Sequence, residues 1–297
     1  MRSAFAALVP FALVLSACGG GAPASVPPQL VLPILPEAHV AQAGTPRPAA
    51  APPPAANASF TPMRPPVVPF AVTPAAQAIA AAADREDADK KIDAGRHPAE
   101  LLSFLNLKPG DRVAELIAGG GYTTELLARA VGPKGKVWGE NNALLMKFAE
   151  KRWAERLAKP VMKNVVRVDK ELDAPLPPDA KNLDAVVMVL FYHDTVWMNA
   201  DRDKMNHAAF DALKHGGQYV IVDHSAPEGS GTADVKTTHR IDELFVLREI
   251  ERAGFHHVAS GDFLRNPADT RDWNDSPSAS GDRRGTSDRF VLKFIKP

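Results

Sequence analysis

The sequence predicts an α/β fold with a doubly wound, mainly parallel sheet of seven strands. Two observations carry this prediction. Segments with strand character alternate with helical segments from residue 76 to the end of the chain, an order typical of a parallel sheet covered by helices. The apolar segment 183–191 is continuous rather than alternating, as expected for a strand buried on both faces.

The individual elements follow from these patterns in chain order. Helices are expected over residues 76–91, 97–105, 122–130, 143–157, 205–213 and 241–253, and Gly254 is a common type of helix stop. Strands are expected over the short apolar segments at residues 111–117, 136–138, 165–168, 183–191, 218–222, 256–263 and 289–295.

The N-terminus has the features of an export signal. Arg2 precedes an apolar stretch over residues 4–15, which is too short to span a bilayer core of about 30 Å. The segment LSAC, ending at Cys18, resembles the lipobox of bacterial lipoproteins, in which the signal is cleaved before a cysteine that is then lipidated. Gly19 in the next position predicts an outer-membrane lipoprotein whose domain faces the periplasm. The alternative is a plain signal peptide, residues 1–17, with an incidental cysteine.

Composition divides the remaining chain into two parts. Residues 19–75 hold 15 of the 27 prolines and almost no charge. Proline removes backbone donors and fixes φ, so residues 18–75 are expected to form a disordered tether. Residues 76–297 are long enough for one folded domain.

Charge and cysteine content exclude several classes of function. Lysine plus arginine equals aspartate plus glutamate, 35 against 35, so no basic excess exists to bind nucleic acid. The only cysteine is Cys18, which rules out an internal disulfide and a zinc site built on several thiolates. Membrane contact is expected only through the lipid anchor, and the oligomeric state is left open.

A glycine-rich turn between residues 113 and 140 predicts a cofactor site. Glycine permits a tight turn and close approach of a ligand to the backbone, and the amino end of a helix favours negative ligand groups. A second strand ends in Glu140, where nucleotide-binding α/β folds place an acid for ribose hydroxyls. The predicted cofactor-binding residues here are Glu115, Ala118, Gly119, Gly120, Gly121, Tyr122 and Glu140.

The glycine spacing separates two cofactor classes. A dinucleotide fingerprint, G-x-G-x-x-G, fails because Thr124 occupies its last position, which weakens the case for a nicotinamide-dependent oxidoreductase. The form (D/E)-x-G-x-G-x-G of class I S-adenosylmethionine-dependent methyltransferases matches Glu115, Gly119 and Gly121, whereas Ile117 replaces its first glycine. A structural turn without a ligand remains the alternative.

Further segments resemble the same family in order. LDAVVMVLFYHDT, GGQYVIVDHSA and the tail ending RFVLKFIKP resemble its fourth strand, its fifth strand and its last antiparallel pair, so that the resemblance covers residues 98–297. AGGGYTTELL, VDHSAPEGSG, THRID and FLRNPAD together look like a family of bacterial predicted methyltransferases. The resemblance implies a Rossmann-like methyltransferase fold with an antiparallel last strand, S-adenosyl-L-methionine as cofactor, Asp169 near the adenine amino group, and a small-molecule acceptor of unknown identity.

Candidate catalytic groups follow strands four and five. Sites in parallel sheets lie outside the carboxyl ends of the strands, where His193, Asp194 and His224 are found. These three side chains are the predicted catalytic residues, because a positioned base removes a proton from a hydroxyl or amine acceptor. A hydrogen-bonded structural role is the competing interpretation of each histidine.

Three further features leave alternatives open. His193, Asp194, Asp223, His224 and His239 are suitable metal donors, but their spacing does not force them together, so no metal site is predicted. Arg240 is interpreted as a partner in a helix-end ion pair, or as a group that binds an acidic acceptor. Residues 265–289 are expected to form a solvated flap or a lid.

The predicted export signal conflicts with the predicted cofactor, because export places the domain in the periplasm whereas S-adenosylmethionine is made in the cytoplasm. The alternative function is therefore a non-catalytic periplasmic lipoprotein that binds a ligand or partner on a methyltransferase scaffold. Ile117 favours that alternative, whereas the acids and glycines favour the enzyme.

Overall fold

The computed structural model describes residue 67 and residues 69–297. The predicted signal peptide, Cys18 and nearly all of the predicted tether lie outside the described residues. Within the described part, no helix combines the length and the apolar character that crossing a membrane requires. Folded packing begins at Phe70, whose ring lies 5.6 Å from the rings of both Phe104 and Phe263.

Seven strands form one mixed sheet in the order β3-β2-β1-β4-β5-β7-β6. Their bounds are β1 Arg112–Leu116, β2 Lys136–Asn141, β3 Val165–Asp169, β4 Leu183–Val189, β5 Leu213–His224, β6 His256–Gly261 and β7 Arg289–Ile295. β7 lies antiparallel between β5 and β6, and the other pairs of neighbouring strands are parallel. The predicted fold class, a doubly wound and mainly parallel sheet of seven strands with the last strand antiparallel, is confirmed.

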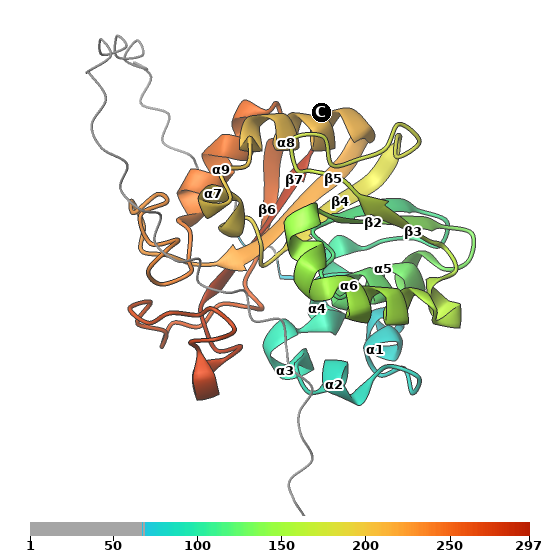
Figure 1. Ribbon diagram of the computed structural model, residues 1–297, viewed down its shortest axis with the longest axis horizontal. Helices are drawn as coiled ribbons and strands as arrows, with labels where there is room; N and C mark the ends of the chain where they lie inside the picture. Colours follow the sequence, from blue (N-terminus) through green and yellow to red (C-terminus); the bar gives the residue numbers. More distant parts are fainter. Residues whose placement is uncertain (1–66, 68) are drawn as a thin grey trace, which may run out of the picture.

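Helices cover both faces of this sheet. They are α1 Pro74–Ala80, α2 Asp87–Lys90, α3 Asp93–Arg96, α4 Pro98–Leu105, α5 Tyr122–Val131, α6 Ala143–Leu157, α7 Asp194–Trp197, α8 Arg202–Ala212 and α9 Glu243–Arg252. Figure 1 shows α8 and α9 on one side of the sheet and α4 and α5 on the other. Alternate residues of β4 enter two apolar clusters, Val186 and Met188 with α8 and α9, and Ala185 and Val187 with α4 and α5.

The order of the strands fixes where a ligand site belongs. The chain adds β2 and β3 on one side of β1 and then returns to add β4 and β5 on the other. The crevice at the carboxyl ends of β1 and β4 is therefore the topological switch point, where open α/β sheets bind ligands.

Two predicted elements differ from the structure. The single helix expected over residues 76–91 is wrong, because the chain turns between α1 and α2 and buries Arg85, which donates to Asp93 at 2.7 Å. The strand expected over residues 136–138 extends to Asn141, one residue past Glu140. The backbone of Glu140 pairs with that of Val168 in β3.

Candidate functional site

The glycine-rich turn after β1 is tied to the end of β2. The backbone N–H of Ile117 donates to Glu140 Oε2 at 2.9 Å, and that of Ala118 donates to the Glu140 carbonyl at 2.7 Å. Asn141 accepts from the N–H of Gly119 at 2.7 Å and donates to its carbonyl at 3.1 Å. The predicted acid therefore faces the predicted turn, and several of the turn's polar groups already bind β2.

The three glycines of this turn have different surroundings. Side-chain atoms of Arg152 and Trp153 lie within 2.7 Å and 2.5 Å of where methyl groups on Gly120 and Gly121 would stand. A methyl group on Gly119 would meet no atom of the described chain within 4 Å. Gly119 is thus the position where the turn has an open face, and its φ of +56° suits glycine.

Ile117 adopts a left-handed backbone conformation, which favours glycine. Its φ is +56°, an outlier for a β-branched residue, and its side chain is buried in the cluster that also holds Leu145 and Phe191. The cavity beside Leu145, Phe191 and Trp197 has a volume of only about 10 Å³. This part of the crevice is therefore filled by side chains.

Two predicted cofactor residues point away from the open face at Gly119. The carboxylate of Glu115 is buried and accepts a hydrogen bond from the Thr124 hydroxyl in α5. The Tyr122 hydroxyl donates to Asp93 Oδ1 of α3 at 2.7 Å. Both contacts hold α5 and α3 in place, whereas Glu140 faces the turn directly.

Glu140 combines full burial with an unused acceptor. Its side chain is 0 % exposed, and Oε1 has no hydrogen-bond partner among the described residues. Burial raises the pKa of Glu140 to about 8, although the Ile117 N–H opposes this shift. A buried acceptor without a partner costs free energy, so Oε1 is suited to a donor that arrives from outside.

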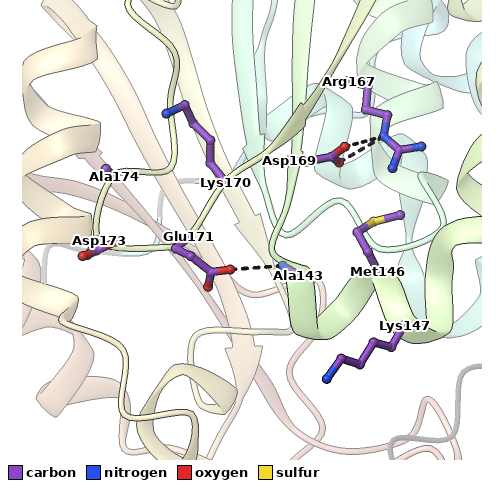
Figure 2. A pocket seen from close by; sticks show the side chains of 9 residues that line it. All are labelled: Ala143, Met146, Lys147, Arg167, Asp169, Lys170, Glu171, Asp173 and Ala174. Atoms are coloured by element: carbon purple, nitrogen blue, oxygen red, sulfur yellow. Dashed lines mark hydrogen bonds and ion pairs between the residues drawn. The ribbon is translucent and has the colours of Figure 1, made fainter.

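A hollow of about 700 Å³ opens at the end of β3 and the start of α6, and neither Glu140 nor the glycine turn is among the residues that line it. Figure 2 shows its lining, which includes Met146, Lys147 and Asp169. Asp169 is paired with Arg167 at 2.9 Å, and Glu171 accepts from the Ala143 N–H at 3.3 Å. The volume falls within the range of small-molecule sites.

The predicted catalytic residues gather at the ends of β4 and β5. His193 Nδ1 lies 2.7 Å from Asp223 Oδ1, and the backbone N–H of His193 donates to Asp223 Oδ2 at 2.7 Å. Its Nε2 lies 3.3 Å from Asp194 Oδ1. The structure also brings in His239, whose ring centroid is 4.1 Å from that of His193.

The histidines and acids of this cluster shift one another's pKa values. Burial disfavours protonated His193, but Asp194 and Asp223 outweigh it and hold its pKa well above the usual value. Burial also opposes the charged form of Asp194, but His193 and His239 lower its pKa to about 2. Burial lowers the pKa of His239 to about 3.

The segment 265–289 is docked against the site by polar contacts. His224 Nδ1 lies 3.0 Å from the Ser287 hydroxyl and is paired with Asp275. Arg240 is fully buried and paired with Asp269 at 2.7 Å, so its partner comes from this segment. Sequence reasoning missed Asn141, the last residue of β2, and Asp275, because nothing in the local pattern distinguishes them from other polar residues.

Comparisons with known proteins found a family model and solved structures to which this chain is similar. The family model for protein-L-isoaspartate(D-aspartate) O-methyltransferase matches residues 73–169, from α1 to the end of β3. A methyltransferase from Aquifex aeolicus described as S-adenosylmethionine-dependent is 19 % identical, with a TM-score of 0.46 over 72 % of this chain and 100 % of its own.

Two other solved structures give similar values. An O-methyltransferase from Thermotoga maritima described as S-adenosylmethionine-dependent is 20 % identical, with a TM-score of 0.46 over 69 % of this chain and 64 % of its own. Fibrillarin from Aeropyrum pernix, solved with bound S-adenosyl-L-methionine, is 14 % identical, with a TM-score of 0.45 over 69 % of this chain and 76 % of its own.

Proposed function

We propose that this protein is an S-adenosylmethionine-dependent methyltransferase acting on a small-molecule or envelope acceptor. One observation carries the proposal: the Glu140 carboxylate lies against the glycine turn with one buried oxygen unpartnered among the described residues. The family-model match over residues 73–169 supports the same activity.

The residues present fit the adenosine part of the cofactor. Glu140 Oε1 would accept from a ribose hydroxyl, and Asp169, which lines the hollow, would accept from the adenine amino group. The open face at Gly119 leaves room beside the backbone. When bound, the cofactor supplies an electrophilic methyl group on a sulfonium centre.

The acceptor belongs at the ends of β4 and β5. His193, Asp194 and His224 are the predicted catalytic groups there. Of these, His224 is the candidate base, because burial lowers its pKa and keeps its ring neutral, whereas Asp194 and Asp223 hold a proton on His193. Asp223 is a positioning residue, because it binds both the ring and the backbone of His193. Ser287 and Asp275 both contact Nδ1 of the His224 ring.

The proposal includes the location predicted from the N-terminus. Cleavage after residue 17, lipidation of Cys18 and a tether to residue 75 would place the domain in the periplasm, anchored in the outer membrane. The enzyme then requires a cofactor supply outside the cytoplasm.

A specific observation favours a second candidate function, a non-catalytic binding module on the same scaffold. Ile117 fills the place of the first glycine, and Glu140 and Asn141 bind amides of the turn. In that case another ligand or partner occupies the hollow beside Asp169.

Calorimetric titration of the full chain with S-adenosylmethionine, or with its demethylated product, tests the proposal. Wild type is expected to bind, and Gly119→Val is expected to lose binding, because valine fills the open face of the turn. Gly216→Val is the control, since Gly216 also has positive φ and open surroundings but lies near the start of β5, away from the site. No heat at millimolar ligand would favour the binding module.

A further inference from the structure

His193, Asp194 and His239 each offer one ligand atom, and these atoms all lie within 4.8 Å of one another. Asp194 Oδ1 is 3.3 Å from His193 Nε2 and 3.7 Å from His239 Nδ1. Donors bound to one tetrahedral ion at about 2.0–2.2 Å lie about 3.3–3.6 Å apart. The separation of 3.3 Å lies in this range and that of 3.7 Å lies slightly above it, so a small shift of His239 would let the three donors share one ion.

His193 is oriented as metal-binding histidines usually are. Such a histidine binds the metal through one ring nitrogen and donates the other ring N–H to a carboxylate. Here Nδ1 contacts Asp223 at 2.7 Å, while Nε2 is fully buried and unpartnered among the described residues. If Nδ1 donates to Asp223, then Nε2 directs a lone pair toward the Asp194 carboxylate. Only a positive centre between them, a proton or a metal ion, makes this arrangement favourable.

The other two side chains are held in place and leave a route from solvent. The Trp197 indole N–H donates to Asp194 Oδ1 at 2.6 Å, which fixes that carboxylate at the start of α7. The His239 backbone N–H donates to the Asp234 carbonyl at 3.1 Å. His239 is 16 % exposed at its side chain, whereas those of His193 and Asp194 are 0 % and 4 % exposed. An ion would therefore enter past His239.

We propose that His193, Asp194 and His239 bind a divalent transition-metal ion, with Zn²⁺ as the best match. Two imidazoles and one carboxylate suit zinc, whereas Mg²⁺ and Ca²⁺ prefer oxygen ligands. Three protein ligands leave a coordination position open, as in catalytic zinc sites. That open position would orient an oxygen or nitrogen of the acceptor; this role, but not metal binding itself, rests on the proposed function.

Titration of the EDTA-treated full chain with ZnCl₂ tests the proposal by calorimetry. One Zn²⁺ per chain is expected to bind at neutral pH with a dissociation constant in the micromolar range or below, and MgCl₂ is expected to give no heat. Co²⁺ in the same site is expected to absorb visible light as a tetrahedral complex.

Variants locate the ion. His239→Ala is expected to weaken Zn²⁺ binding at least 100-fold, while His207→Ala, on an exposed face of α8, leaves it unchanged. Asp223→Asn is expected to weaken binding about 10–100-fold, since it alters the partner of a ligand. Zn²⁺ should also raise the melting temperature of wild type but not that of His239→Ala.

Two results would overturn the proposal: no zinc binding by wild type, which would mean that a proton fills the gap, or equal binding by His239→Ala. Binding of S-adenosylmethionine is measured in a separate titration in the presence of EDTA, so that cofactor binding and zinc binding are determined independently. Loss of cofactor binding with zinc binding retained would contradict the proposed function and leave the metal site standing.

Discussion

At the scale of single residues, Ile117 retains a glycine backbone conformation without being glycine. A left-handed conformation costs an L-residue about 1–2 kcal/mol, whereas the buried isoleucine side chain contributes about 2–5 kcal/mol relative to alanine. Burial of the side chain outweighs the backbone strain, which explains how the residue is tolerated at φ +56°.

Two substitutions of Ile117 distinguish the backbone strain at this residue from the burial of its side chain. Ile117→Ala and Ile117→Gly lose nearly the same buried surface, but only glycine relieves the strain. Ile117→Gly is expected to be more stable than Ile117→Ala by about 1 kcal/mol in urea unfolding, the reverse of the usual order. If alanine is the more stable variant, the left-handed conformation of residue 117 is refuted.

Glu115 and Glu140 make stability depend on pH. Burial raises the pKa of each carboxyl to about 8, while an unfolded glutamate titrates near about 4.3. The folded state binds these protons more tightly, so the stabilisation they give is complete at low pH. It is lost as the pH rises from about 4.5 through about 8.

Glu115→Gln removes one of these two groups. Its free energy of unfolding is expected to fall less than that of wild type between about pH 5 and pH 8, measured by urea denaturation at several pH values. Glu155→Gln is the control, because Glu155 is exposed. Parallel pH profiles for wild type and Glu115→Gln would show that Glu115 is charged in the folded state.

At the scale of secondary structure, a buried ion cluster joins α2, α5 and α6. Arg156 is 1 % exposed, and its Nη1 lies 2.7 Å from Asp89 Oδ2 and 2.5 Å from Glu125 Oε2. Its Nε also donates to the carbonyl of Gly120 at 2.6 Å. The guanidinium of Arg156 therefore links these helices to the glycine turn, while Arg152 also pairs with Asp89, and Arg129 and Lys159 pair with Glu125.

Arg156→Met is expected to destabilise the protein by about 1–3 kcal/mol, because two buried carboxylates lose one partner each while Arg152, Arg129 and Lys159 still pair with them. Lys151→Met, which removes a cation from an exposed pair on the same helix, is expected to change stability by less than about 0.5 kcal/mol. Chemical denaturation of both variants measures the difference. A similar small loss in both would mean that the cluster contributes little.

The same scale explains which elements the sequence could predict. Periodicity located the strands and longer helices, since their apolar residues recur with a fixed spacing. It merged α1 with α2, because the turn at Arg85 depends on a contact with Asp93 in another element. The short α7 depends on its position after β4, and local pattern gives no signal for it.

At the scale of the whole molecule, strand order accounts for the candidate site. The glycine turn follows β1 and His193 follows β4, and these strands are neighbours in the sheet. The parallel alternation was enough to predict that such residues share one edge. The approach of His239 and Asp275 was not predictable, because loops deliver them, and neither was the contact that Asn141, at the end of β2, makes with Gly119.

The proposed membrane anchor also concerns the whole chain. Cys18→Ser is expected to release the protein from sedimented membranes into the soluble fraction, since the acyl chains on this residue would provide the anchor. Fractionation of cells that express wild type and variant measures the effect. A variant that still sediments with membranes would contradict the lipid anchor at Cys18.

The most direct test of the central claim is the affinity of Glu140→Gln for S-adenosylmethionine, measured by calorimetry beside wild type. Replacing the carboxyl acceptor with an amide is expected to weaken binding about 2- to 12-fold, because an ordinary hydrogen bond contributes about 0.5–1.5 kcal/mol. Circular dichroism should give the same folded spectrum for both proteins. Equal affinity in wild type and Glu140→Gln, or no binding by wild type at millimolar cofactor, would contradict the assignment of Glu140 to the ribose.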